Sequence, residues 1–164
     1  MTATEHGPLF EAVPNFSEGR DLEKVGRIAN AVRAVPGVRV LGRTSDADHN
    51  PSVLTLAGEE EPLLQAAVAL ARACATELDL SGQTGEHPRV GSLDVLPFVP
   101  LEGATLEDAA RLASRAGEAI GKLGFAVYLY EYAATAEHRR NLADIRRGGY
   151  EGLAARAGSE GWLP

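Results

Sequence analysis

The order of apolar patterns along the chain is the strongest constraint on its fold. Four short segments have the composition of β-strands, at residues 9–13, 38–41, 52–57 and 92–99. Two stretches with apolar residues at helical spacing separate them, one beginning after Asp21 and one near Glu60. This βαββαβ order predicts an α+β, ferredoxin-like fold. It is a two-layer sandwich in which helices cover one face of a mixed, mostly antiparallel sheet.

Extra α/β elements are expected at the C-terminal end. Thr105 and Asp108 form the ends of a capping-box pattern that opens a third helix. Residues 125–132 are the most β-prone segment and predict a fifth strand. Helices are predicted at 137–145 and 150–157. No long linker interrupts these patterns, so we expect residues 1–164 to form one domain whose sheet leaves one face bare.

Composition narrows the class of protein. Lys and Arg number 16 against 23 Asp and Glu, so the net charge of −7 argues against a general nucleic-acid binder. Cys74 falls on the apolar side of a predicted helix, which favours a buried thiol over a disulfide or zinc ligand. The N-terminus shows no signal-peptide pattern, and no apolar run approaches the roughly 20 residues that span a bilayer. We therefore expect a cytoplasmic protein that does not act on membranes.

One polar loop has the makings of an active site. It reads GQTGEHPRV from Gly82 and runs into the apolar strand at 92–99, which contains a single charge, Asp94. The following proline biases His87 away from helical geometry, which leaves a near-neutral base between Glu86 and Arg89 at the mouth of a strand. The alternative is that these are ordinary loop charges and that the histidine is incidental. Arg89 suits either a substrate carboxylate or a salt bridge inside its own loop.

Two further loops carry candidate binding residues. Asn15, Ser17 and Glu18 precede a helix, where backbone N–H groups can receive an anion; the alternative is that they only cap the helix. A second set lies in one loop: Asp46, Asp48, His49 and Asn50. The acids and the histidine are possible metal ligands by type. His49 and Asn50 otherwise line a substrate cavity or hold the turn into the next strand, and we expect no metal.

Five sequence blocks occur in one order and resemble a known family. They are VPNFSEGRD at 13–21, DADHN at 46–50, TGEHPRVGSLDVLPFVP at 84–100, VYLYEYAA at 127–134 and IRRGGYEGL at 145–153. Together they resemble the N-terminal subdomain of glutamate formimidoyltransferase, or formiminotransferase, over about residues 9–163. GEHPR by itself would be a weak match.

The resemblance implies an activity and a catalytic residue. The family transfers a formimino group from N-formimino-L-glutamate to N5 of tetrahydrofolate, a co-substrate, in histidine degradation. Relatives also handle the formyl group of 5-formyltetrahydrofolate. The family's catalytic histidine falls on His87, to which we assign the role of general acid and base. The resemblance implies no metal, and it makes Asp46 and the other loop residues candidates for substrate or folate contact.

The resemblance also implies a missing half. In this family the sheets of two subdomains face each other across a folate tunnel, and the chain continues beyond the position of Pro164 into the second subdomain. We therefore expect this sequence to supply half a tunnel, completed by a complementary C-terminal subdomain or in a homodimer. The arginines near the end, Arg139, Arg140, Arg146 and Arg147, form either a solvated helix face or a docking site for the folate tail. Two alternative functions are a non-catalytic folate-binding or pairing relative, and a metal-dependent hydrolase.

Overall fold

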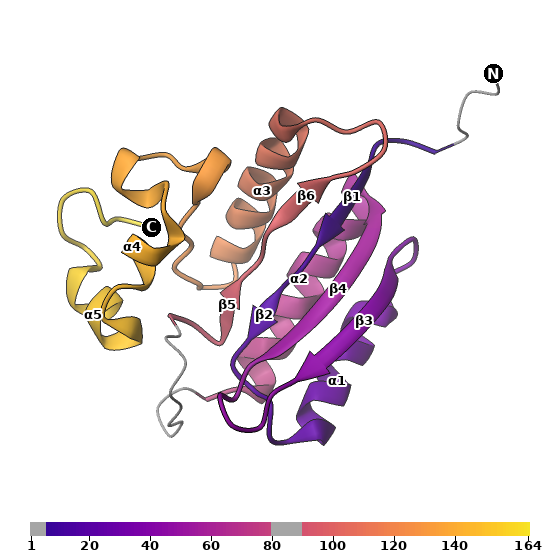
Figure 1. Ribbon diagram of the computed structural model, residues 1–164, viewed down its shortest axis with the longest axis horizontal. Coiled ribbons are helices and arrows are strands. Elements are labelled where there is room, and N and C mark those ends of the chain that lie inside the picture. The colour runs from indigo at the N-terminus through magenta and orange to yellow at the C-terminus, as the bar shows by residue number, and fades with distance from the viewer. Residues whose placement is uncertain (1–5, 80–89) are drawn as a thin grey trace.

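The sheet and its helices form two layers in the computed structural model, which describes residues 6–79 and 90–164 (Figure 1). The strands are β1 (Leu9–Ala12), β2 (Asn15–Phe16), β3 (Arg39–Ser45), β4 (Ser52–Glu59), β5 (Leu93–Val95) and β6 (Phe98–Pro100). The order β5-β2-β4-β1-β6 runs across the sheet, with β3 paired to β4, and every pairing is antiparallel. The predicted α+β class with an antiparallel sheet and helices on one side is confirmed.

A proline interrupts two lines of the sheet: one divides the strand predicted at 92–99, and the other separates the strand predicted at 9–13 from β2, which forms where a loop was predicted. Pro14 separates β1 from β2, and Pro97 separates β5 from β6. Proline has no N–H to donate to a ladder, so regular pairing stops there. The neighbouring groups keep the pieces aligned, because Leu54 N–H donates to the Pro14 carbonyl at 3.1 Å and Val13 N–H to the Pro97 carbonyl at 3.3 Å. Each divided strand therefore still runs along one line of the sheet.

Three long helices cover one face of the sheet: α1 (Leu22–Arg33), α2 (Glu60–Glu77) and α3 (Leu106–Gly121). The Asp21 side chain caps α1 by accepting the backbone N–H groups of Glu23 and Lys24. Thr105 and Asp108 form the predicted capping box of α3. The starts of all three helices are therefore where the sequence patterns placed them.

The core lies between these layers. The β4 side chains alternate, with Leu54 and Leu56 buried against the helices and Thr55 and Ala57 half-buried on the opposite face. The largest fully buried side chains are Phe10, Phe16, Ile28, Leu54, Leu56, Leu63, Leu70, Leu112, Val25 and Val32. Cys74 is buried among them, and burial raises the pKa of its thiol to about 12, which keeps it protonated and inert. The structural role expected for Cys74 is confirmed.

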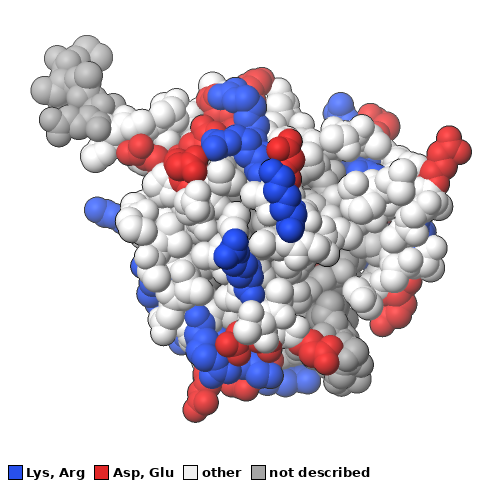
Figure 2. Space-filling view, turned by 180° about the vertical axis from the view of Figure 1, so that it is seen from behind, with Lys and Arg blue, Asp and Glu red and all other residues white. Residues whose placement is uncertain are grey.

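The two faces of the molecule differ. The helical face, seen in Figure 2, carries both acidic and basic side chains. The opposite sheet face faces the viewer in Figure 1, and no described helix among α1, α2 and α3 covers it. Glu11, Ala57 and Val99 lie in register across it, and Val99 is 40% exposed. This open face is the bare sheet surface that the sequence pattern predicts.

The predicted fifth strand is wrong. Residues 125–130 pair with no described strand, and Glu131–Ala133 forms a 3-10 turn instead. Val127 and Leu129 lie over Gly117 of α3, since a Cβ at that glycine would be 3.4 Å from each side chain. A cavity lined by both this segment and β5–β6 separates the two. The apolar side chains are thus satisfied by packing on a helix rather than by a sheet ladder.

One of the two helices predicted near the C-terminus is divided. The helix expected at 137–145 is divided into a 3-10 turn, Glu137–Arg139, and α4 (Leu142–Arg146), because Asn141 caps the second piece. Helix α5 spans Gly149–Arg156. No described helix is long and apolar enough to cross a membrane.

The basic cluster is not one solvated face. Arg139 is buried over the Tyr128 ring and donates to the carbonyls of Gly161 and Leu163. Arg146 is largely covered and paired with Asp94. Arg140 and Arg147 are exposed, and each pairs with an acid three residues earlier in the sequence. The solvated-face interpretation therefore holds for two of the four arginines and is wrong for the other two.

Candidate active site at one end of the sheet

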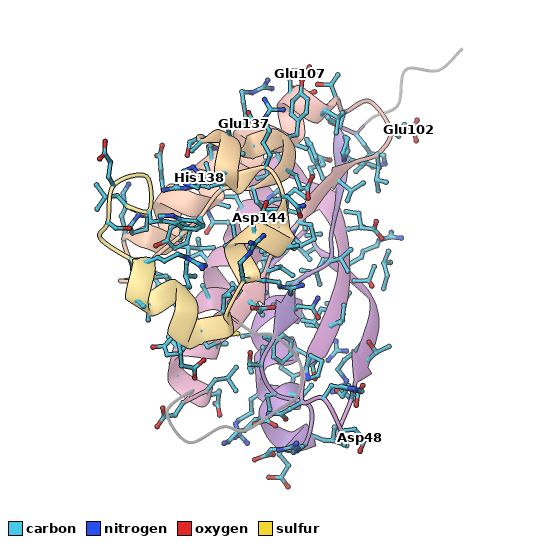
Figure 3. All side chains as sticks on the ribbon, turned by 60° about the vertical axis from the view of Figure 1, so that its left-hand side comes forward. Asp48, Glu102, Glu107, Glu137, His138 and Asp144 are labelled. Carbon is cyan, nitrogen blue, oxygen red and sulfur yellow. The ribbon has the colours of Figure 1, made fainter. Side chains whose placement is uncertain are left out.

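The predicted binding residues meet at one end of the sheet. Asp48 marks this end in Figure 3, and Glu102 and Glu107 mark the other. A small cleft there is lined by Asn15, Phe16, Ser17, His49, Asn50, Pro51 and Asp94. The end of β2, the β3–β4 loop and the start of β5 thus contribute to one site. The structure brings together candidates that lie more than 30 residues apart in the sequence.

Ser17 is a structural link within this cleft. Its hydroxyl donates to the Gly91 carbonyl at 2.8 Å, and its backbone N–H donates to the Ser92 carbonyl at 2.9 Å. Because Ser17 is buried, these bonds join the end of β2 firmly to the segment that leads into β5.

Glu18 binds backbone N–H groups of the turn that precedes α1. One oxygen of its buried carboxylate accepts from the backbone N–H groups of Arg20 and Asp21, each at 3.0 Å. The Glu18 carbonyl accepts the Ser52 hydroxyl at 2.5 Å. Glu18 therefore stabilises the turn before α1, whereas Asp21 caps the helix itself.

The β3–β4 loop holds Asn50 and Asp46 in defined geometry. Asn50 has a left-handed backbone with φ of 66°, and its side-chain oxygen accepts the Gly19 N–H at 3.0 Å. The Asp46 carboxylate accepts the backbone N–H groups of Asp48 and His49 and contacts His49 Nδ1 at 2.8 Å. The hydrogen bonds from His49, the backbone one foremost, lower the pKa of Asp46. His49 and Asp46 are both about half exposed, which leaves them accessible to a ligand.

Within residues 6–79 and 90–164, no group of three or more His, Cys, Asp or Glu side chains is placed to hold a metal. Asp46 is engaged with its own loop and with His49. Three residues of the metal-dependent hydrolase alternative, Asp46, Asp48 and His49, are therefore not grouped as a metal site, and its fourth residue, His87, lies outside the described part of the chain.

Asp94 is a site residue that the sequence analysis did not select. Its side chain is 5% exposed, it accepts the Val90 N–H at 2.6 Å, and it pairs with Arg146 of α4. The available signal was its isolation as the one charge in an apolar strand, since a buried carboxylate requires a partner. The partner is 52 residues away, which no local pattern reveals.

The three remaining candidates, Glu86, His87 and Arg89, lie outside the described residues. The described chain resumes at Val90, next to the cleft.

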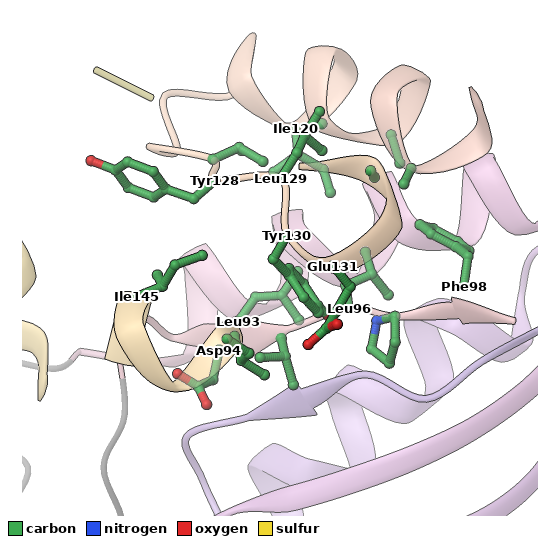
Figure 4. Close-up of a pocket in the computed structure, with 18 of the residues that line it drawn as sticks. Leu93, Asp94, Leu96, Phe98, Ile120, Tyr128, Leu129, Tyr130, Glu131 and Ile145 are labelled. Atoms are coloured by element: carbon green, nitrogen blue, oxygen red, sulfur yellow. The ribbon is translucent and has the colours of Figure 1, made fainter. Parts of the chain in front are cut away.

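A larger cavity of about 350 Å³ adjoins the cleft (Figure 4). It lies between β5–β6, α3 and residues 125–133, and its lining is largely apolar. Tyr130 and Glu131 stand opposite Leu93 and Leu96, and Asp94 lies at one end. Burial is the main cause that raises the pKa of Tyr130 to about 12, so its phenol stays protonated at neutral pH.

The chain is thus a two-layer α+β sandwich with an open sheet face and a small cleft at one end of the sheet. Comparison with known proteins shows the family to which it belongs. The model of the formiminotransferase domain, N-terminal subdomain, matches residues 9–164. The chain belongs to this family.

Three relatives illustrate the relationship. The chain is 43% identical over 159 residues to a glutamate formimidoyltransferase of Thermoplasma acidophilum and 37% identical over 157 residues to that of Streptococcus pyogenes. Each match covers 95% of this chain and 52% of the relative. It is 40% identical over 157 residues to the formimidoyltransferase-cyclodeaminase of Sus scrofa, covering 95% of this chain and 29% of that protein. The chain thus spans about half the length of the glutamate formimidoyltransferases that it matches.

Proposed function

We propose that the chain is the N-terminal half of a catalyst that transfers a formimino group from N-formimino-L-glutamate to N5 of tetrahydrofolate. The family match over residues 9–164 carries this proposal. The convergence of Asn15, His49 and Asn50 in one cleft supports it, since their polar side chains are of types that bind small polar substrates. Tetrahydrofolate acts as co-substrate, and the reaction belongs to histidine degradation.

His87 is the proposed general acid and base. N5 of tetrahydrofolate attacks the amidine carbon, a C–N bond forms, and the bond to the glutamate nitrogen breaks. His87 takes the proton from N5 and returns it to the departing nitrogen, so no proton is gained or lost overall. Glu86 and Arg89 flank His87, and Arg89 is a candidate fork for a substrate carboxylate.

The described cleft residues have different proposed roles. Asn15, His49 and Asn50 present polar groups to the cleft, and Asp46 orients His49 through the 2.8 Å contact. Ser17 and Glu18 support the site through their backbone contacts. Asn50 has both roles, because its side-chain oxygen also accepts the Gly19 N–H and so supports the wall of the cleft.

The open sheet face is the proposed wall of the folate tunnel. We count β1 with β2 as one interrupted strand, and β5 with β6 as another, which gives a ferredoxin-like βαββαβ sheet. Residues 1–164 form one cytoplasmic domain in this proposal. A complementary C-terminal subdomain, or a second copy of this chain, covers the open face. Good small-molecule sites bury roughly 70–90% of a ligand, which one wall does not achieve.

A transfer assay tests the proposal. The chain is measured with and without the C-terminal half of the Streptococcus pyogenes relative, mixed or fused, and free glutamate is quantified. Transfer that requires both halves supports the proposal. Folate binding without glutamate release by either form indicates the alternative, a non-catalytic folate-binding relative.

A further inference from the structure

A buried ion pair connects the cleft to the C-terminal region. One Asp94 oxygen faces the Arg146 guanidinium, and the other accepts the Val90 N–H at 2.6 Å. The Asp94 side chain is 5% exposed and that of Arg146 is 22% exposed. The two carboxylate oxygens therefore hold two different segments: helix α4 and the backbone just before β5.

Asp94 places this ion pair in the wall of the candidate site. Asp94 lines the small cleft together with Asn15 and Asn50, and it also lines the adjoining cavity. In Figure 4 it lies at the start of β5, near Ile145 of α4. Asp94 thus forms part of the wall between the cleft and the cavity.

Helix α4 presents Arg146 to this wall. Asn141 caps the helix by accepting the Ala143 N–H at 2.9 Å. Ile145, which directly precedes Arg146 in the sequence, is buried. An uncompensated buried carboxylate is costly, so Asp94 favours the arrangement in which α4 is docked. Because the same carboxylate pairs with Arg146 and accepts the Val90 N–H, the docking of α4 is linked to the backbone position of Val90.

We propose that Asp94 and Arg146 are a positioning pair for the transfer reaction, an inference that rests on the proposed function. In this role both side chains act through the segments that they hold in place. The pair fixes the Val90 backbone, and with it one wall of the cleft, relative to Asn15 and Asn50. A displacement of about 1 Å in a catalytic geometry can lower a rate by on the order of 10².

The substitutions separate the two contacts of Asp94. Asp94→Asn retains the shape and an oxygen that can accept the Val90 N–H, but it removes the charge. Asp94→Ala removes both contacts, and Arg146→Met keeps much of the apolar stem without the guanidinium. Arg147→Met is the matched control, because Arg147 is 76% exposed, follows Arg146 directly and pairs with Asp144.

The first measurement is steady-state kinetics in the two-half assembly, which is this chain mixed with or fused to the C-terminal half of the Streptococcus pyogenes relative. Asp94→Ala and Arg146→Met should each lower kcat about 10- to 100-fold, with KM for formiminoglutamate changed less than about threefold. Asp94→Asn should lose less than Asp94→Ala. The double variant Asp94→Ala/Arg146→Met should be no slower than the slower single variant, because paired residues are non-additive. Arg147→Met should retain full kcat.

The second measurement needs no activity. Hydrogen exchange at the Val90 amide of the chain itself should be at least about tenfold faster in Asp94→Ala than in the wild type, and unchanged in Arg147→Met. If the wild-type assembly transfers no formimino group, the proposed function fails while the exchange experiment still decides whether Asp94 holds Val90. Unchanged Val90 exchange in Asp94→Ala overturns the pair. Unchanged kcat in the folded Asp94→Asn and Arg146→Met variants, or fully multiplicative losses in the double variant, overturns its positioning role.

Discussion

The Asn50 side chain accepts the backbone N–H of Gly19 at 3.0 Å across 31 residues of sequence. A Cβ at Gly19 would lie 2.3 Å from the Asp46 carbonyl oxygen, so the turn before α1 and the β3–β4 loop are in direct backbone contact. This contact brings the VPNFSEGRD and DADHN blocks together at the cleft.

Asn50→Ala should lower the free energy of unfolding by about 2–3 kcal/mol. The buried Gly19 N–H loses its acceptor, and alanine is strained at a φ of 66°. Asn50→Gly should cost less, about 1–2 kcal/mol, because glycine accepts that backbone geometry. Urea denaturation measures both. Asn30→Ala, on the exposed side of α1, is the control; equal losses for Asn50→Ala and Asn50→Gly would contradict the backbone contribution.

Asp46 should give the protein a measurable acid dependence. Hydrogen bonds from His49 lower the folded-state pKa of Asp46 below its ordinary value of 3.8. Its stabilising contribution is therefore present above pH 3.8 and is lost as the pH falls through the lower folded value. Asp46→Asn should lower the urea midpoint at pH 7, and the difference from wild type should shrink toward pH 3. Asp48→Asn is the neighbouring control. A difference that grows on acidification would refute this assignment.

The cavity beside α3 should accept a larger side chain. Ala113 lines it and is partly buried, so Ala113→Leu should fill part of the 350 Å³ and raise stability by about 0.5–2 kcal/mol. Glu118→Leu adds similar apolar mass to an exposed position of the same helix and should give no such gain. Thermal unfolding compares the two. Destabilisation by Ala113→Leu would show that the cavity cannot accommodate the leucine.

Several elements were predictable because they depend on neighbouring residues. The Asp21 cap, the capping box at Thr105 and the βαββ portion follow from local patterns and periodicity. The strand expected at 125–132 failed for a tertiary reason, since packing of Val127 and Leu129 on Gly117 overrides β-propensity.

The same distinction holds within the site. Asn15, His49 and Asn50 were selected by type and loop position, and their residues line one cleft. Asp94 was visible as an isolated charge, but its pairing with Arg146 spans 52 residues and depends on how α4 docks. Sequence patterns thus identified the cleft's loops, whereas the contacts between its walls join residues far apart in the sequence and depend on the tertiary fold.

The chain without a complementary half should self-associate through the open sheet face. A homodimer would cover apolar groups such as Val99, which is 40% exposed on β6. Sedimentation velocity over a range of concentrations should show a dimer that Val99→Lys weakens and Glu118→Lys, on the helical layer, does not. A strict monomer at high concentration would rule out this association.

The most direct test of the proposed function is the His87→Ala variant in the two-half assembly. Glutamate release from N-formimino-L-glutamate in the presence of tetrahydrofolate is measured alongside tetrahydrofolate affinity. If His87 is the general acid and base, the variant transfers roughly 10²- to 10⁴-fold more slowly while its folate affinity changes little. Near-wild-type glutamate release by the His87→Ala assembly would contradict that role.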